Sequence, residues 1–203
     1  MDEIKIYFIV TSAISLIILS LLLLYPLYQR YNYRHNFEKK YYQGIYRYVL
    51  NKDYLLINNF VYTSSGYSEP LVNHMVFGKK YIYLIFDFYF YGGLEGEEND
   101  KLWIYYPYKK NPMYVTNPLL TAKDMLDIIS SIVNADKESF IPIVLLNNTC
   151  IYDIKRNSGG IVLTNEKNLK KTFHEYESQN IKDLNQTKLF EAVKNIASIN
   201  ERK

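Results

Sequence analysis

Cysteine and histidine are scarce in this chain. Its 203 residues include one cysteine and three histidines. One cysteine excludes an internal disulfide framework and a cysteine-rich zinc site, and three histidines leave little for a histidine-based metal centre. The chain also lacks a large excess of positive or negative charge, because 24 basic and 21 acidic residues give a formal net charge of +3. That excess is too small for a protein that mainly coats nucleic acid, although it permits a local basic patch.

The common nucleotide-binding and hydrolase motifs are missing as well. The sequence contains no phosphate loop ending in Gly-Lys-Ser/Thr, no Gly-x-Ser-x-Gly elbow and no His-Glu-x-x-His. The glycines at 92, 93 and 96 lack the spacing of a dinucleotide loop and predict a turn instead. The acidic residues between Glu95 and Asp100 predict a solvated loop. Cys150 follows a predicted buried strand with no histidine near it, which predicts an inert thiol.

One long run lacks charge altogether. No charged residue occurs from Ile6 to Gln29. As a helix this run is about 36 Å long, enough to cross a hydrocarbon core of about 30 Å. Tyrosines stand near both ends, and Pro26 is expected in the last turn. A cleaved signal peptide and a buried core helix fit worse, because the run is long and the residues before it are not basic. We predict an uncleaved membrane anchor with its juxtamembrane segment in residues 1–36.

The residues flanking the run predict its orientation. Arg30, Arg34, Lys39 and Lys40 follow it, whereas a single lysine and two acids precede it. Cationic side chains stay on the cytoplasmic side of a span. We therefore expect a single-pass membrane protein with the N-terminus outside and residues 37–203 in the cytoplasm, in agreement with a lone, reduced Cys150.

Residues 37–203 have the size of one domain, and hydrophobic periodicity divides them into elements. Helices are predicted over 37–50, 119–133, 166–176 and 184–199. Strands are predicted over 54–62, 70–77, 81–91, 101–106, 140–146 and 161–163. Turns at 64–66 and 78–80 make the first three strands an antiparallel meander, and Gly92-Gly93 are expected to end the third. The sum is a mixed α/β domain with a central sheet and flanking helices.

A set of short motifs occurs in a recognisable order. The set comprises Gly44, Val72-Asn73-His74, the strand from Tyr81 to Phe88, Gly92 and Gly96, Trp103, and Asn117-Pro118. In order and spacing it resembles the nuclease-related domain (NERD) family over roughly residues 38–178. That family carries Gly-Glu, Ile-Asp-His, Glu-x-Lys, a glycine-punctuated turn, a Trp, and Asn-Pro with a downstream Gln. The resemblance implies a restriction-endonuclease-like α/β fold.

The functional groups of that family are missing at the matched positions. Asn73 stands in place of the Asp of Ile-Asp-His, and Phe86 and Phe88 replace the acid and the lysine of Glu-x-Lys. Ile45 replaces the helix acid after Gly44, and Thr121 stands where the downstream Gln is expected. Metal-dependent cleavage of a phosphodiester needs carboxylates for the cation and a lysine for water and charge. We therefore expect a degenerate site to which no catalytic residue, metal or cofactor is assigned.

Asp87 does not restore the site. Side chains alternate across a strand, so Phe86 and Phe88 share one face and Asp87 points to the other. A one-residue slip in register would bring Asp87 round together with Tyr89, still without a lysine and with only Asn73 opposite.

The leading hypothesis is a membrane-anchored binding or scaffolding module at the cytoplasmic face. A protein partner would bind an aromatic surface of this domain, unless its rings are core residues enriched by codon bias. The surface comprises Tyr89, Phe90, Tyr91, Tyr105, Tyr106 and Tyr108. The alternative is a metal-dependent nuclease, with Mg²⁺ or Mn²⁺, or a nucleic-acid-binding protein with a rearranged site. Nucleic-acid contacts would then come from Lys79, Lys80, Lys109 and Lys110, with Lys167, Lys170 and Lys171, unless these are ordinary solvated lysines.

Overall fold

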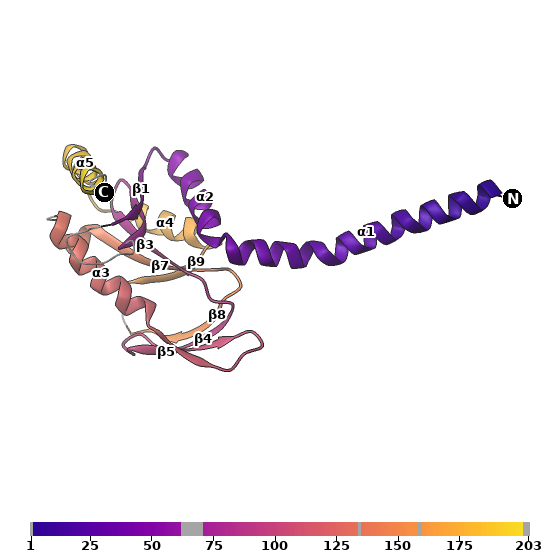
Figure 1. Cartoon of the computed structure of the whole chain (residues 1–203). Coiled ribbons are helices and arrows are strands. Elements are labelled where there is room, and N and C mark those ends of the chain that lie inside the picture. The colour runs from indigo at the N-terminus through magenta and orange to yellow at the C-terminus, as the bar shows by residue number, and fades with distance from the viewer. Residues whose placement is uncertain (1, 62–70, 134, 158–159, 201–203) are drawn as a thin grey trace. The chain divides into compact units, whose positions relative to one another are not determined.

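The computed structural model describes residues 2–61, 71–133, 135–157 and 160–200 (Figure 1). The chain divides into two compact units, Met1–Lys40 and Tyr41–Lys203. The sequence placed the boundary after residue 36, and the division of the structure falls slightly later, inside helix α2 (Phe37–Leu50). The turn predicted at 64–66 lies outside the described residues.

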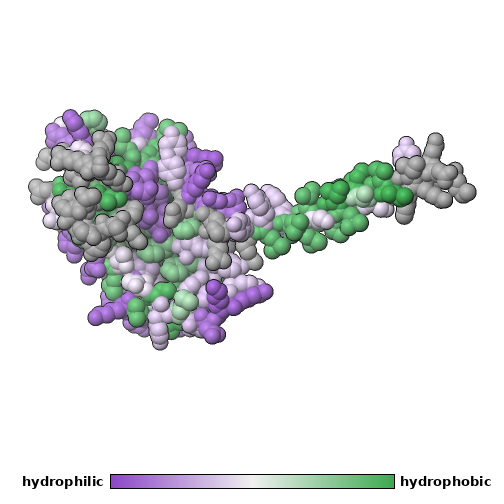
Figure 2. Space-filling view, viewed as in Figure 1, coloured by the Kyte–Doolittle hydropathy of each residue, from purple (hydrophilic) through white to green (hydrophobic). Residues whose placement is uncertain are grey.

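Helix α1 (Asp2–His35) contains the uncharged run. Within it, Ile9–Gln29 is long and apolar enough to cross a membrane, and none of it is buried. Figure 2 shows hydrophobic side chains along this part of the helix. Two hydroxyls inside the run donate to the carbonyl one turn earlier, each at 2.8 Å: Thr11 Oγ1 to Tyr7 O and Ser20 Oγ to Leu16 O. These hydroxyls are therefore satisfied without water, as a hydrocarbon environment requires.

One detail of the predicted anchor needs correction. Pro26 does not lie in the last turn, because α1 continues through it to His35. Proline is tolerated inside a membrane-spanning helix more readily than in a soluble one. No residue of Ile9–Gln29 is buried in the described structure, which gives no support to a buried core helix. The same length and composition fit a signal sequence, so the uncleaved anchor stays a prediction.

The first sheet has five strands in the order β1-β2-β3-β7-β9. β2 (Val72–Phe77) is antiparallel to both of its neighbours, β1 (Leu55–Phe60) and β3 (Ile82–Phe88), as the predicted meander requires. β7 (Phe140–Leu146) and β9 (Val162–Asn165) then add in parallel. The continuous apolar run of β7 is buried at six of its seven positions, in agreement with a strand covered on both faces.

The second sheet was not predicted as a separate unit. It has the order β6-β5-β4-β8, with β4 (Gly92–Glu97) parallel to β8 (Ile151–Lys155) and antiparallel to β5 (Leu102–Pro107). β6 (Met113–Thr116) completes it. Gly92-Gly93 therefore begin a strand instead of only ending one. The acidic segment expected as a solvated loop is divided, because Glu95 and Glu97 lie in β4 and Glu98 is buried just after it.

Two glycines explain the path of β4. Gly92 has φ of +143°, and a Cβ there would lie 2.0 Å from Tyr106 O, so only glycine fits. A Cβ on Gly96 would lie 2.4 Å from Trp103 Cδ1, so the missing side chain makes room for the indole. Trp103 is fully buried, and its Nε1–H donates to Glu97 O at 2.9 Å.

Helices cover both faces of the first sheet. α3 (Pro118–Val133) and α5 (Gln186–Asn200) contribute Leu119, Ala122 and Ile196 to the apolar cluster that contains Phe86. On the other face, Phe173 of α4 (Leu169–Glu177) packs edge-on against Tyr83 at 4.7 Å and stacks on Tyr48 of α2 at 4.6 Å. The predicted mixed α/β class with flanking helices is thus confirmed (Figure 1).

Candidate functional site

The positions matched to the nuclease-related family do not all lie on one face of the first sheet. Phe86 is 4% exposed and belongs to the apolar cluster beneath α3, whereas Ile45 is fully buried on α2, across the sheet. Phe88 is half-buried and stacks on Phe90 with ring centroids 6.3 Å apart. The Thr121 hydroxyl donates to Asn117 O at 3.3 Å, an ordinary contact within a helix turn. These side chains offer apolar packing and no ligand set.

Asn73 supports the sheet. Its Oδ1 accepts the backbone N–H of Asp87 at 2.9 Å. The ladder between β2 and β3 extends to the pair His74 and Ile85, so the Asn73 amide supplies an acceptor just beyond it. The predicted resemblance places a metal-binding acid at this position, whereas here the side-chain oxygen accepts a hydrogen bond from the neighbouring strand.

Asp87 points away from Phe86, as strand alternation predicts, and meets a partner that the sequence analysis missed. His74 Nε2 lies 2.8 Å from Asp87 Oδ2, and His74 Nδ1 lies 2.6 Å from Asn58 Oδ1. Asp87 lies on β3, His74 on β2 and Asn58 on β1. The ring of Tyr42, from α2, stacks on the imidazole with centroids 6.4 Å apart and planes at 23°. The signal available in the sequence was that His74 and Asp87 are polar residues inside largely apolar strands.

The geometry of this network favours a structural role. The side chains of His74 and Asp87 are 5% and 1% exposed, and both imidazole nitrogens already face protein oxygens. A metal ligand or general base needs a ring nitrogen open to the cation or to the substrate. Within the described residues there is no group of three or more His, Cys, Asp or Glu that could hold a metal ion. The network joins three strands in the interior and offers no exposed reactive atom.

Two ionisable side chains outside this network, Tyr83 and Cys150, have raised pKa values, which favour their neutral forms. Burial, followed by the hydrogen bond to Glu177, raises the pKa of Tyr83, whose hydroxyl donates to Glu177 Oε1 at 2.7 Å. Burial raises the pKa of the Cys150 thiol to about 12. A thiol with that pKa has almost no thiolate at neutral pH, so Cys150 is a poor nucleophile.

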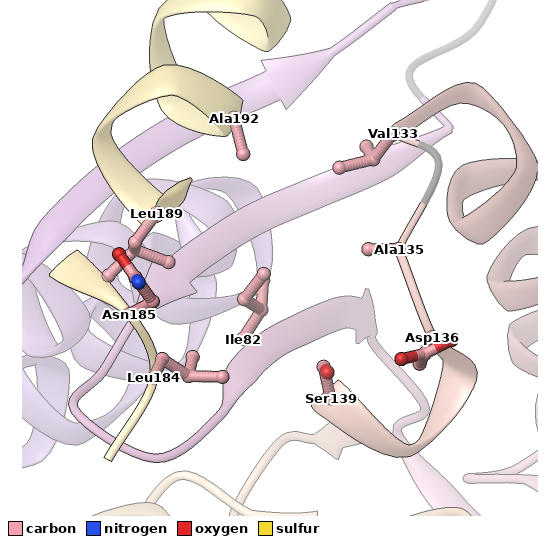
Figure 3. A pocket seen from close by; sticks show the side chains of 9 residues that line it. All are labelled: Ile82, Val133, Ala135, Asp136, Ser139, Leu184, Asn185, Leu189 and Ala192. Atoms are coloured by element: carbon pink, nitrogen blue, oxygen red, sulfur yellow. The ribbon is translucent and has the colours of Figure 1, made fainter. Parts of the chain in front are cut away.

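A pocket of about 290 Å³ lies between the end of α3 and the start of α5 (Figure 3). Its walls are mainly apolar, including Ile82, Val133 and Leu189. Asp136, Ser139 and Asn185 add polar groups. Among the described residues that line it there is no cationic side chain and no cysteine or histidine, so these residues provide no site for an anion.

The candidate basic residues occupy turns of two different sheets. Lys79 and Lys80 lie in the turn between β2 and β3, where the Lys80 ammonium donates to Gln179 O. Lys109 and Lys110 lie between β5 and β6, where Lys109 Nζ sits 5.4 Å from the centroid of the Tyr108 ring.

The candidate aromatic surface is likewise divided. Phe90 and Tyr105 pack edge-on with centroids 5.2 Å apart, against the main apolar cluster. Tyr89 and Tyr91 are half-buried. Tyr106 and Tyr108 are exposed. Only part of the predicted surface is therefore available to a partner.

Comparison with known proteins adds no relative. No family model, no curated protein and no solved structure matches the chain.

Proposed function

We propose that this chain is a membrane-anchored, catalytically degenerate NERD-like domain that acts as a binding or scaffolding module at the cytoplasmic membrane face. The proposal combines the apolar helix of the first unit with an α/β domain that resembles a nuclease-related domain in sequence. The resemblance also suggests a restriction-endonuclease-like arrangement of the mixed sheet.

The burial of Phe86 is the observation that supports the proposed loss of catalysis. The family places a metal-binding acid at this position, and here a phenyl ring packs against α3. Burying such a ring stabilises a fold by about 1.5–3 kcal/mol, whereas a charged carboxylate there would need a partner. A hydrated divalent cation would have to displace this packing. The position therefore favours stability over metal chemistry.

The orientation rests on charge. Arg30, Arg34, Lys39 and Lys40 follow the apolar helix, which favours the cytoplasm for the second unit. In cells we expect Lys123→Cys, in a Cys150→Ser background, to react with a membrane-impermeant maleimide only after permeabilisation. A Glu3→Cys variant should react in intact cells. The reverse pattern would show that the domain faces outward.

A nuclease assay tests the proposal directly. The full chain, purified in a non-ionic detergent, is incubated with DNA or RNA and Mg²⁺ or Mn²⁺, and we expect no cleavage above the background of the preparation. Cleavage that disappears in Asn73→Ala or Asp87→Asn, but persists in the surface variant Asp124→Asn, would contradict the proposal and favour a rearranged active site. Tryptophan emission would verify that each variant is folded.

A further inference from the structure

The second sheet leaves one face open to solvent. Along β4, β5 and β8 side chains alternate: Leu94 and Trp103 are buried in the apolar cluster, whereas their neighbours point outward. In an antiparallel or mixed sheet, an open face of this kind usually carries polar side chains.

Here the open face carries large apolar side chains. Ile151 is 79% exposed, Tyr114 is 73% exposed and Leu102 is 52% exposed. Together with Ile104 and the acidic residues beside it, Leu102 and Tyr114 line a pocket of about 330 Å³. Exposed apolar groups with a charged rim are typical of protein interaction sites.

The charge on this face is opposite in sign to that of the chain. Glu95, Glu97, Asp100 and Asp153 line the pocket with a single cation, Lys155, giving a local formal charge of −3. Since the whole chain is +3, the remaining residues carry +6. The acidic face is therefore segregated within a basic protein.

Two of the carboxylates lie side by side. Glu95 and Asp153 are register partners on neighbouring strands, an arrangement in which like charges destabilise the sheet. Lys155 does not bridge them, because its Nζ lies 3.2 Å from Glu97 Oε1. Glu95 Oε2 accepts the hydroxyl of Tyr106 at 2.8 Å, a neutral donor. A cation from outside the domain would relieve this repulsion.

We propose that this open face docks a Lys/Arg-rich polypeptide segment that also carries apolar side chains. A basic group of the segment sits between Glu95 and Asp153, while an apolar side chain packs on Leu102 and Tyr114. The inference rests on the proposed role as a binding module and names the partner's chemistry. The negative charge disfavours nucleic acid and anionic lipid, and none of the described acids forms a cluster able to hold a metal ion.

The test uses the full chain in non-ionic micelles and a fluorescein-labelled octapeptide containing four lysines and two phenylalanines. Binding is followed by fluorescence anisotropy, with empty micelles as the blank. Glu95→Gln combined with Asp153→Asn removes the paired charges and keeps the side-chain shapes. Asp124→Asn combined with Glu138→Gln removes the same charge from exposed positions elsewhere and is the matched control.

We expect the Glu95/Asp153 double variant to raise the Kd about fivefold or more, as the loss of two exposed ion pairs allows, and the control to stay within about twofold of the parent. Tyr114→Ser should also weaken binding, and its effect should persist at high salt because apolar contacts are not screened. Equal effects of the two double variants, or equal binding of a peptide with glutamates in place of lysines, would overturn the inference. The peptide assay measures binding and the nuclease assay measures cleavage. Loss of the expected peptide binding therefore contradicts this inference alone, whereas cleavage would contradict the proposed function.

Discussion

The buried contact between His74 and Asp87 should be worth far more than any ion pair on the surface. The two side chains are 5% and 1% exposed, with 2.8 Å between Nε2 and Oδ2. Replacing either one by leucine leaves the other polar group in the interior without this contact, which costs about 3–5 kcal/mol in comparable buried pairs. Replacing both removes the polar groups together. We therefore expect the double variant to be more stable than the sum of the single changes predicts.

The magnitude follows from direct contact. Residues that share a hydrogen bond couple by about 0.5–3 kcal/mol, and the burial of this pair places it near 2–3 kcal/mol. An internal control is the pair Asp127 and Lys137, whose side chains are 53% and 59% exposed with 2.7 Å between the charged atoms. Alanine replacements there should couple by no more than about 1 kcal/mol.

The protein supplies its own reporter for this double-mutant cycle. Trp103 is the single tryptophan of the chain and is fully buried, so its emission should shift to the red on unfolding. Urea titrations of the full chain in non-ionic detergent then give the free energy of unfolding of each variant. If the His74 and Asp87 costs add within about 0.5 kcal/mol, the two side chains do not act as a pair and our reading of the network is wrong.

Three further predictions concern backbone, thiol and membrane. Gly92→Ala should cost more than about 2 kcal/mol by urea titration, because its φ is +143° and the added Cβ meets Tyr106 O, whereas Gly44→Ala, in an open helical position, should stabilise by about 0.5–1 kcal/mol. Cys150 should react with an aromatic disulfide reagent at least tenfold more slowly in the native protein than in urea. Because its folded pKa of about 12 exceeds the ordinary 9.0, its contribution to stability is complete below pH 9 and is lost as the pH rises towards 12. Removing Ile9–Gln29 should move the chain from the membrane pellet to the supernatant, and retention in the pellet after a carbonate wash would contradict the anchor.

Local patterns were sufficient for several elements. The predicted helix at 37–50 matches α2 because its apolar and aromatic positions recur with helical spacing, and the predicted strand at 140–146 matches β7 because it is a continuous apolar run. Proline at the first position of α3 marked that helix start. In each case the information lies within one turn or one strand.

The second sheet shows where local patterns stop. The aromatic run continues past Phe88, so periodicity alone predicted one strand as far as Tyr91. β3 ends at Phe88, and two residues later the Phe90 amide donates to the buried Asn147 Oδ1 at 2.8 Å, a contact between residues 57 positions apart. β6 and β8 are short, and β8 takes its partner, β4, from a distant segment. The alternation of apolar and charged residues from Tyr152 to Lys155 was a weak signal that the sequence analysis did not use.

The composition alone determined that the chain has no disulfide framework, and its uncharged run alone determined a helix long and apolar enough for a membrane. Both properties depend on residue counts and nearest neighbours. Only the tertiary structure decided that His74 lies between Asp87 and Asn58, and that Glu95 lies beside Asp153 on an open face. These contacts depend on the pairing and register of strands, which bring together side chains that are distant in sequence.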